Sequence, residues 1–217
     1  FQNNYAEVNG GAIATPDNYK NAFFVLDNAS FVRNTAGSKG GAICVSGSQT
    51  AVQVSNSEFR ENTATAGGVI SIDSSASLQM FQTNAYNNKA QNGGDGGFLF
   101  AWLANAILLS DVSIEGSSTE DNGGGGAIAV YSTPVAMEQV TLKKCQAGTG
   151  GGGAILLSEN AEGHLLNCEL DDNSVKSSGG HIRVAASSLI VHSKGSQLTW
   201  PVQEPVFHEA IILQTQK

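Results

Sequence analysis

Residues 31–45 read FVRNTAGSKGGAICV, and residues 59–72 read FRENTATAGGVISI. Both stretches carry Phe-x-x-Asn, then a Gly-Gly pair, then a short apolar run. The Gly-Gly element occurs seven times, and its second glycines are Gly11, Gly41, Gly68, Gly97, Gly126, Gly153 and Gly180. Their spacings of 30, 27, 29, 29, 27 and 27 residues average about 28. A constant period of this length is the signature of a repeat architecture.

Apolar and small or polar residues alternate within each repeat, as at Ile43 and Val45 or at Ile70 and Ile72. This period of two indicates short strands, and no helical spacing is sustained. Three strands of about 4 to 5 residues, joined by Gly, Asn and Ser corners, use about one repeat. We therefore predict an all-β fold, a right-handed parallel β-helix of about eight turns with three short strands per turn.

Stacked turns place equivalent residues in columns. We expect one inward column after the glycine pairs, formed by Ile13, Ile43, Ile70, Leu99, Ile128, Ile155 and Ile182. A second inward column begins with Phe1, Phe31 and Phe59. Three residues further on we expect an asparagine ladder at a bend, formed by Asn4, Asn34, Asn62, Asn88 and Asn173. Asparagine suits this position because it tolerates left-handed backbone and its amide can pair with the turns above and below.

We expect the repeat to cover residues 1–217 as a single β-helix domain, in which 198–217 form a degraded last turn and tail. No amphipathic capping helix is recognisable at either end. Uncapped solenoid ends expose sheet edges that can pair with another chain. We expect a segment of a longer surface protein or assembly.

The joint recurrence of F-x-x-N and G-G-A-[ILV] resembles the repeats of chlamydial polymorphic outer-membrane proteins and related right-handed parallel β-helix surface proteins. The match extends over nearly the whole chain. The resemblance implies an extracellular or cell-surface adhesin, autotransporter passenger or fibre component, with no active site shared by the family.

Composition excludes several classes of function. Charged residues make up only 14% of the chain and its net charge is −8, so we expect no nucleic-acid partner. No apolar run approaches the ~18 residues of a membrane span, so we expect no membrane insertion. The three cysteines, Cys44, Cys145 and Cys168, suggest neither a disulfide framework nor a zinc site. We predict no metal and no cofactor.

An enzyme is the alternative, because polysaccharide lyases and glycosidases also use parallel β-helices. Such enzymes need clustered carboxylates, beside a basic residue in the lyases. Asp171, Asp172, His181 and Arg183 superficially resemble polygalacturonase elements, but His181 follows Asp172 by nine residues, which predicts different sheets. We therefore expect no catalytic residues. A groove that gathers two carboxylates with an Arg or Lys would favour the polysaccharide-acting alternative.

We interpret these and neighbouring charges as a surface ladder of opposite charges one turn apart. The predicted pairs are Arg33 with Glu61, Lys143 with Asp171, and Lys144 with Asp172.

A partner-binding face is predicted from the strand alternation. If Leu99 and Ala101 point inward, then Phe98, Phe100 and Trp102 point outward, with Tyr131 beside Trp102 on the next turn. The neighbouring outward positions are also apolar: Ala42, Cys44, Val69, Ala127, Ala129, Ala154 and Leu156. An apolar, water-facing patch of this size indicates a binding surface.

We expect other protein subunits to bind at this face or at the solenoid ends, as in an adhesive or structural rod or an accessory subunit of a larger complex. The alternatives are a glycan stacked on the rings, or cover by the chain's own segment from Trp200 to Phe207.

Overall fold

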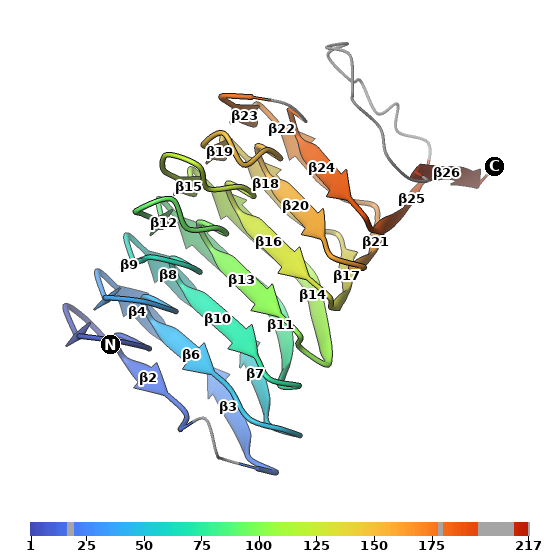
Figure 1. Ribbon diagram of the computed structural model, residues 1–217. Helices are drawn as coiled ribbons and strands as arrows, with labels where there is room; N and C mark the ends of the chain where they lie inside the picture. The colour runs from blue at the N-terminus through green and yellow to red at the C-terminus, as the bar shows by residue number, and fades with distance from the viewer. Residues whose placement is uncertain (17–19, 178–179, 195–210, 217) are drawn as a thin grey trace.

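The computed structural model describes residues 1–16, 20–177, 180–194 and 211–216. Within these ranges the chain forms strands and turns, with no helix. The strands wind into a stack of similar turns that rises from the N-terminus toward the C-terminus (Figure 1). Every strand pairing is parallel and joins equivalent strands of successive turns. The predicted parallel β-helix is confirmed.

Three sheets run along the stack. Sheet 1 contains β1 (Tyr5–Ala6), β5 (Thr35–Ala36), β9 (Thr63–Ala64), β12 (Lys89–Ala90), β15 (Ser118–Thr119), β19 (Gln146–Ala147) and β23 (Ser174–Val175). Sheet 2 contains β2 (Ile13–Ala14), β6 (Ile43–Val45), β10 (Ile70–Asp73), β13 (Leu99–Trp102), β16 (Ile128–Tyr131), β20 (Ile155–Ser158) and β24 (Ile182–Ala185). Seven strands in each of these sheets correspond to seven turns.

Sheet 3 is larger because two of its strands, β11 and β14, continue around a corner. Its main strands are β3 (Phe23–Asp27), β7 (Ala51–Ser55), β11 (Ser77–Tyr86), β14 (Ala106–Glu115), β17 (Pro134–Glu138), β21 (Glu162–Leu166), β25 (Ser188–Lys194) and β26 (Ile211–Gln216). Alongside them lie the short strands β4 (Ser30–Val32), β8 (Glu58–Arg60), β18 (Thr141–Lys143) and β22 (Glu169–Asp171). The predicted last turn at 198–217 lies outside the described residues, except for β26, which pairs with β25.

The predicted isoleucine column is confirmed by the strand register. Ile43 pairs with Ile70, Ile70 with Leu99, and Leu99 with Ile128. The members of this column within the stack are at most 1% exposed. Burial of these side chains, at about 25 cal/mol per Å² of apolar surface, is the main stabilising contribution of the core.

The phenylalanine column is also confirmed. The rings of Phe1 and Phe31 stack with centroids 4.6 Å apart, and those of Phe31 and Phe59 with centroids 5.0 Å apart. The next turn has Ala85 at this position, and there the ring of Phe98 enters the core. Phe98 is 0% exposed and meets Phe59 edge to face at 6.0 Å. The prediction that Phe98 faces outward is therefore wrong.

The strand alternation fails at Phe98 because this residue lies at a corner. The N–H groups of Phe98 and Leu99 both donate to the carbonyl oxygen of Ala127, at 2.8 and 2.9 Å. Two successive amides that share one acceptor bend the chain instead of continuing the pleat. Both side chains consequently face the interior, and the same double contact occurs in the preceding turn, where Val69 and Ile70 donate to Phe98.

The side-chain volumes at two positions of each turn compensate each other. These are the position in the phenylalanine column and the corner position directly after the glycine pair. The buried pairs, each within one turn, are Phe31 with Ala42, Phe59 with Val69, Ile114 with Ala127, and Leu142 with Ala154. In each of these pairs the residue in the phenylalanine column has the larger side chain. In the pair of Ala85 with Phe98 the order is reversed, because the corner residue Phe98 has the larger side chain. Close packing requires this exchange, since volume missing from the column must be supplied from the corner.

The glycine pairs have two separate steric roles. Gly152 adopts a φ of +68°, and a Cβ there would collide with the carbonyl oxygen of Ile155. A Cβ on Gly153 would collide with the carbonyl oxygen of Gly180 in the following turn. The first glycine therefore supplies left-handed backbone, and the second leaves room for the next turn to stack.

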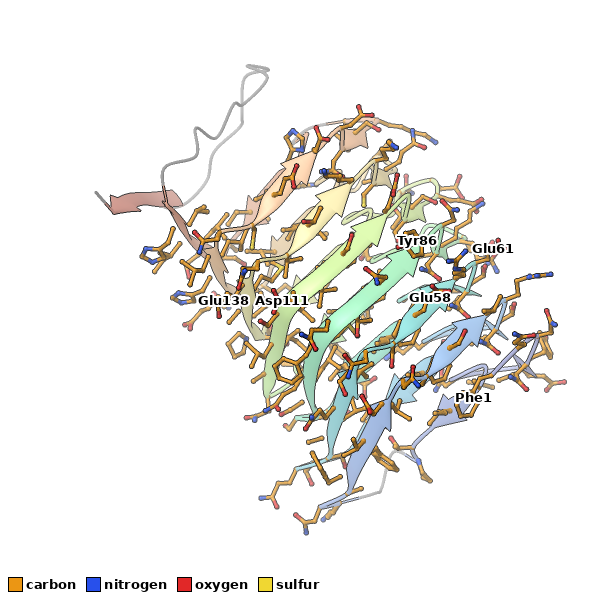
Figure 2. The ribbon with its side chains drawn as sticks, turned by 180° about the vertical axis from the view of Figure 1, so that it is seen from behind. Phe1, Glu58, Glu61, Tyr86, Asp111 and Glu138 are labelled. Carbon is orange, nitrogen blue, oxygen red and sulfur yellow. The ribbon has the colours of Figure 1, made fainter. Side chains whose placement is uncertain are left out.

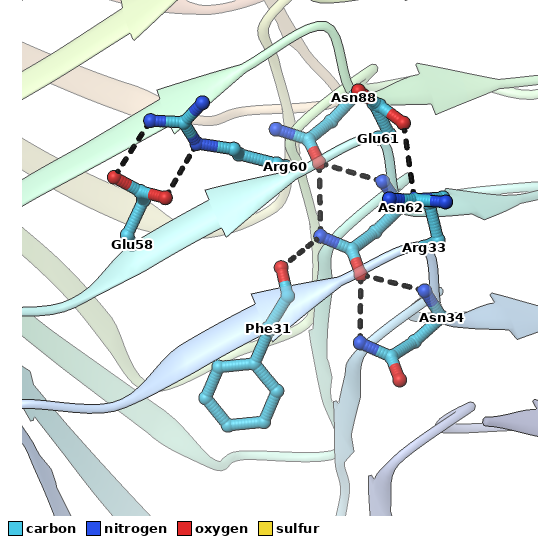
Figure 3. A network of polar contacts seen from close by, with 8 residues as sticks. All are labelled: Phe31, Arg33, Asn34, Glu58, Arg60, Glu61, Asn62 and Asn88. Atoms are coloured by element: carbon cyan, nitrogen blue, oxygen red, sulfur yellow. Dashed lines mark hydrogen bonds and ion pairs between the residues drawn. The ribbon is translucent and has the colours of Figure 1, made fainter. Parts of the chain in front are cut away.

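The expected asparagine ladder forms over its first four members, three of which, Asn34, Asn62 and Asn88, are shown in Figure 3. The Nδ2 atoms of Asn4, Asn34 and Asn62 donate to the Oδ1 atoms of Asn34, Asn62 and Asn88, at 2.8, 2.9 and 3.0 Å. Asn34, Asn62 and Asn88 are 0% exposed, so these bonds satisfy amides that have left water. The ladder is interrupted by Ser117 and Cys145.

Asn173 lies beyond this interruption and keeps part of the pattern. Its Oδ1 accepts from the backbone N–H of Cys145 at 2.9 Å, and its Nδ2 donates to the carbonyl oxygen of Leu142 at 2.9 Å.

The prediction that the asparagine itself adopts the left-handed backbone conformation at this corner is wrong. The residue before the asparagine adopts it. Positive φ angles occur at Asn3, Arg33, Glu61, Asn87, Gly116, Lys144 and Asp172. The left-handed residue turns the chain while its own side chain stays at the surface, and the asparagine that follows can then point into the stack.

We predict that Phe98→Ala lowers the free energy of unfolding by about 3 to 5 kcal/mol, because it leaves a cavity beside Ala85. The double variant Phe98→Ala, Ala85→Phe should recover part of this loss, since the new ring can stack on Phe59. Urea denaturation measures both, and Gln79→Ala at the surface is the control. A Phe98→Ala protein as stable as the control would contradict the core position of Phe98.

We predict that Gly153→Ala destabilises the fold by at least about 2 kcal/mol, because its Cβ meets the backbone of the next turn. Gly180→Ala is the matched control in the last glycine pair, where a Cβ meets nothing within 4 Å in the described part of the chain. Its effect should stay within about 0.5 kcal/mol. Thermal unfolding compares the two, and equal losses would show that stacking contact does not explain the second glycine.

Candidate functional site

Three of the four predicted aromatic residues lie on the outer face of sheet 2. Phe100 and Trp102 belong to β13, and Tyr131 on β16 is in register with Trp102. The ring centroids of Phe100 and Tyr131 are 5.7 Å apart. Phe100 and Tyr131 are half-buried, whereas Trp102 is 43% exposed. With the charged residues around them they form what we call the aromatic site: Phe100, Trp102, Tyr131, Lys39, Asp73 and Asp95.

Lys39 extends across this face from the corner two turns earlier. Its Nζ makes an ion pair with Asp73 at 2.9 Å, and Asp73 is 8% exposed. The same Nζ lies 5.9 Å from the centroid of the Phe100 ring and 5.7 Å from that of the Trp102 ring. An ammonium over aromatic faces is attracted by the ring quadrupole, so Lys39 helps to fix the position of both rings.

Asp95 fixes the position of Tyr131 through a hydrogen bond. Its Oδ2 accepts from the Tyr131 hydroxyl at 2.6 Å, and its Oδ1 accepts from the N–H of Gly124 at 2.6 Å. Burial, and then the negative charge of Asp95, raise the pKa of Tyr131 well above its usual range. The phenol therefore stays protonated and remains a donor to Asp95.

Sequence reasoning missed Lys39, Asp73 and Asp95, although one signal was available. Lys39 and Asp95 each precede a glycine pair. The residues at this position form a column, in which isolated β-bridges and backbone hydrogen bonds connect successive turns. This column contains Asn9, Lys39, Ala66, Asp95, Gly124 and Gly151. Two charged residues in a column of otherwise small or neutral residues mark the turns where a side chain reaches over the sheet.

The broad water-facing apolar patch predicted around these rings is not present. Ala42, Val69, Ala127 and Ala154 occupy the same corner position as Phe98 and are 0% exposed in the core.

Cys44, Ala129 and Leu156 do face outward, but they are at most 5% exposed. The corner segments cover this side of the sheet: a Cβ on Gly124 would lie 2.7 Å from Leu156 Cδ2, and one on Gly125 would lie 3.1 Å from Ala129 Cβ. The large apolar side chains left exposed at β13 are Trp102 and the adjacent Leu103, which is 50% exposed. The segment from Trp200 to Phe207, predicted as a cover, lies outside the described residues.

Of the polygalacturonase-like elements, the aspartates and Arg183 lie apart, whereas His181, in the bend before β24, lies close enough to Asp171 and Asp172 for their charges to act on it. Asp171 is on β22 beside sheet 3, whereas Arg183 is on β24 of sheet 2 and donates to the carbonyl oxygen of Gly150. The Nδ1 of His181 is 3.2 Å from the Nδ2 of Asn173. Burial lowers the pKa of His181, so the ring is neutral at pH 7.

Surface charges pair between turns, but only one predicted pair is confirmed. Arg33 pairs with Glu61 at 3.4 Å (Figure 3). Lys143 is in register with Asp171, as predicted, but its ion pair is with Glu169 at 2.9 Å, and the ion pair of Lys144 is with Glu115 at 2.8 Å and not with Asp172. Long side chains reach diagonal neighbours as readily as opposite ones, which explains the exchange of partners. Such exposed pairs contribute little to stability.

The opposite side of the solenoid is shown in Figure 2, with Glu58, Glu61, Asp111 and Glu138 labelled. In the described ranges, no three His, Cys, Asp or Glu side chains are placed to hold a metal ion. Cys44 and Cys145 are buried and Cys168 is half-buried, and burial raises the pKa of Cys145 to about 12. No helix long and apolar enough to span a membrane occurs in the residues that the structure describes.

Comparison with known proteins gives one match. The family model of the Chlamydia polymorphic membrane protein repeat matches residues 1–16 and 28–46, which contain the first two Phe-x-x-Asn and Gly-Gly elements. No curated protein and no solved structure matches the chain significantly. Residues 1–16 and 28–46 thus match this repeat and lie in the first turns of a parallel β-solenoid, and the repeat suggests a surface protein.

Proposed function

We propose that this chain is a non-enzymatic rod of a cell-surface or extracellular structure, and that it binds other protein subunits through the aromatic site. The observation that carries the proposal is the exposure of Trp102. This large ring is 43% exposed on a sheet face where Cys44, Ala129 and Leu156 are covered by the chain itself. The exposed ring of Trp102, beside the half-buried rings of Phe100 and Tyr131, is the aromatic surface available to a partner on this face.

The order of the rings supports a role in binding. Lys39 and Asp73 hold one side of the site, and Asp95 fixes Tyr131 through a hydrogen bond. Trp and Tyr are the side chains most often found at the centre of protein interfaces. Rings that are already fixed lose little conformational entropy on binding, so more of the contact energy remains as affinity.

The placement of the carboxylates supports a non-enzymatic role. Asp73, Glu61 and Glu115 each pair with a basic residue of another turn. Glycoside hydrolysis needs two carboxyl groups that face one substrate, one of which acts as an acid. At the aromatic site Asp73 is engaged by Lys39, and both oxygens of Asp95 are engaged by the Tyr131 hydroxyl and the Gly124 N–H. Carboxylates engaged within the chain in this way are poorly suited to act on a substrate.

Photo-crosslinking from position 102 tests the proposed function. With a photoreactive amino acid in place of Trp102, we expect crosslinks to a protein subunit in the native surface structure. The matched control replaces Leu166, which is 38% exposed on sheet 3 and should give no specific product. Crosslinks only to saccharide, or equal products from both positions, would overturn the proposal in favour of a glycan-binding or non-specific surface.

A further inference from the structure

The aromatic site already holds one cation of the chain itself. The Lys39 ammonium lies within 6 Å of the Phe100 and Trp102 ring centroids, while its charge is matched by Asp73. Trp is the strongest cation–π acceptor among the side chains, and 43% of Trp102 remains exposed. The site therefore has both the ring type and the free ring surface that a second cation requires.

The charges around the site leave an excess of negative charge. Asp95 accepts only from neutral donors, the Gly124 N–H and the Tyr131 hydroxyl, and it makes no ion pair within the described residues. Glu159 is exposed and follows Ser158, the residue in register with Tyr131.

The fields of Asp95 and Glu159 both reach the phenol of Tyr131 and raise its pKa, whereas Arg183 acts in the opposite direction. Geometry agrees, because the carbonyl oxygen of Glu159 accepts from the hydroxyl of Ser132, the residue after Tyr131, at 2.7 Å, and Arg183 lies on the turn after that of Glu159. The carboxylates of this region are thus Asp73, Asp95 and Glu159, and the cations are Lys39 and Arg183. The whole chain carries a net charge of −8, which also favours a cationic partner.

We infer that the aromatic site recognises an arginine side chain of the partner protein. The guanidinium would lie on the exposed part of the Trp102 ring, with the charges of Asp95 and Glu159 as counter-charges. Arginine suits this site better than lysine because its planar, weakly hydrated group stacks on aromatic rings. This inference rests on the proposed function and specifies the chemistry of the partner.

A peptide titration tests the inference directly. The full chain is titrated with a short arginine peptide and with the same peptide carrying citrulline, which keeps the planar shape but has no charge. The indole N–H signal of Trp102, identified by its loss in Trp102→Phe, is followed by NMR. We expect the arginine peptide to bind about five- to tenfold more tightly than the citrulline peptide, with the difference shrinking at high salt.

Variants separate this site from general attraction to an acidic protein. Trp102→Leu should weaken binding of the arginine peptide at least about fivefold, and Glu159→Gln should weaken it about two- to threefold. Glu138→Gln removes a carboxylate that is also exposed, on sheet 3, and should have no effect. Equal affinity for the citrulline peptide, or unchanged binding by Trp102→Leu measured from backbone amide signals, would overturn the inference.

The two proposals fail in different ways. If position 102 crosslinks to a protein segment that contains no arginine, the inference on chemistry is overturned and the proposed function stands. If position 102 crosslinks to no protein, the proposed function itself is overturned.

Discussion

Direct stacking of each turn on the next is the constraint on which this protein depends. The backbone of one glycine pair lies against that of the next, so that a single Cβ at Gly153 would collide with Gly180. Only at this close spacing do the parallel strands pair in every sheet. The isoleucine column, the stack of phenylalanine rings and the asparagine ladder all follow from this stacking. It places equivalent side chains of successive turns directly above one another and pointing in the same direction.

The candidate site arises where the turns differ from one another. Lys39 and Asp95 interrupt a column of small or neutral residues, and each reaches across sheet 2 to a later turn. Gly124 in that column has no side chain, and there the side chain of Leu156 packs against the glycine and covers the outer face of sheet 2. A regular repeat supplies a stiff frame, and departures from the repeat give one part of its surface a distinct chemistry.

Phe98 shows where reasoning from the pattern succeeded and where it failed. Period-two alternation assigned Phe100, Trp102 and Tyr131 to the outer face, where all three lie. It failed for Phe98 because alternation does not extend across a corner at which two amides share one acceptor. Ala85 was the available warning, since a small residue in the phenylalanine column requires a large one nearby.

The sequence by itself determined the fold class, the period, the register of the columns and the first four rungs of the ladder, because stacked turns repeat one local pattern. Tertiary structure alone decided which outward residues meet water. Exposure of Trp102 and burial of Leu156 depend on corner segments that fold over the sheet, and the ion pairs of Lys143 and Lys144 depend on side-chain reach. These contacts join different turns, and a linear period does not contain their geometry.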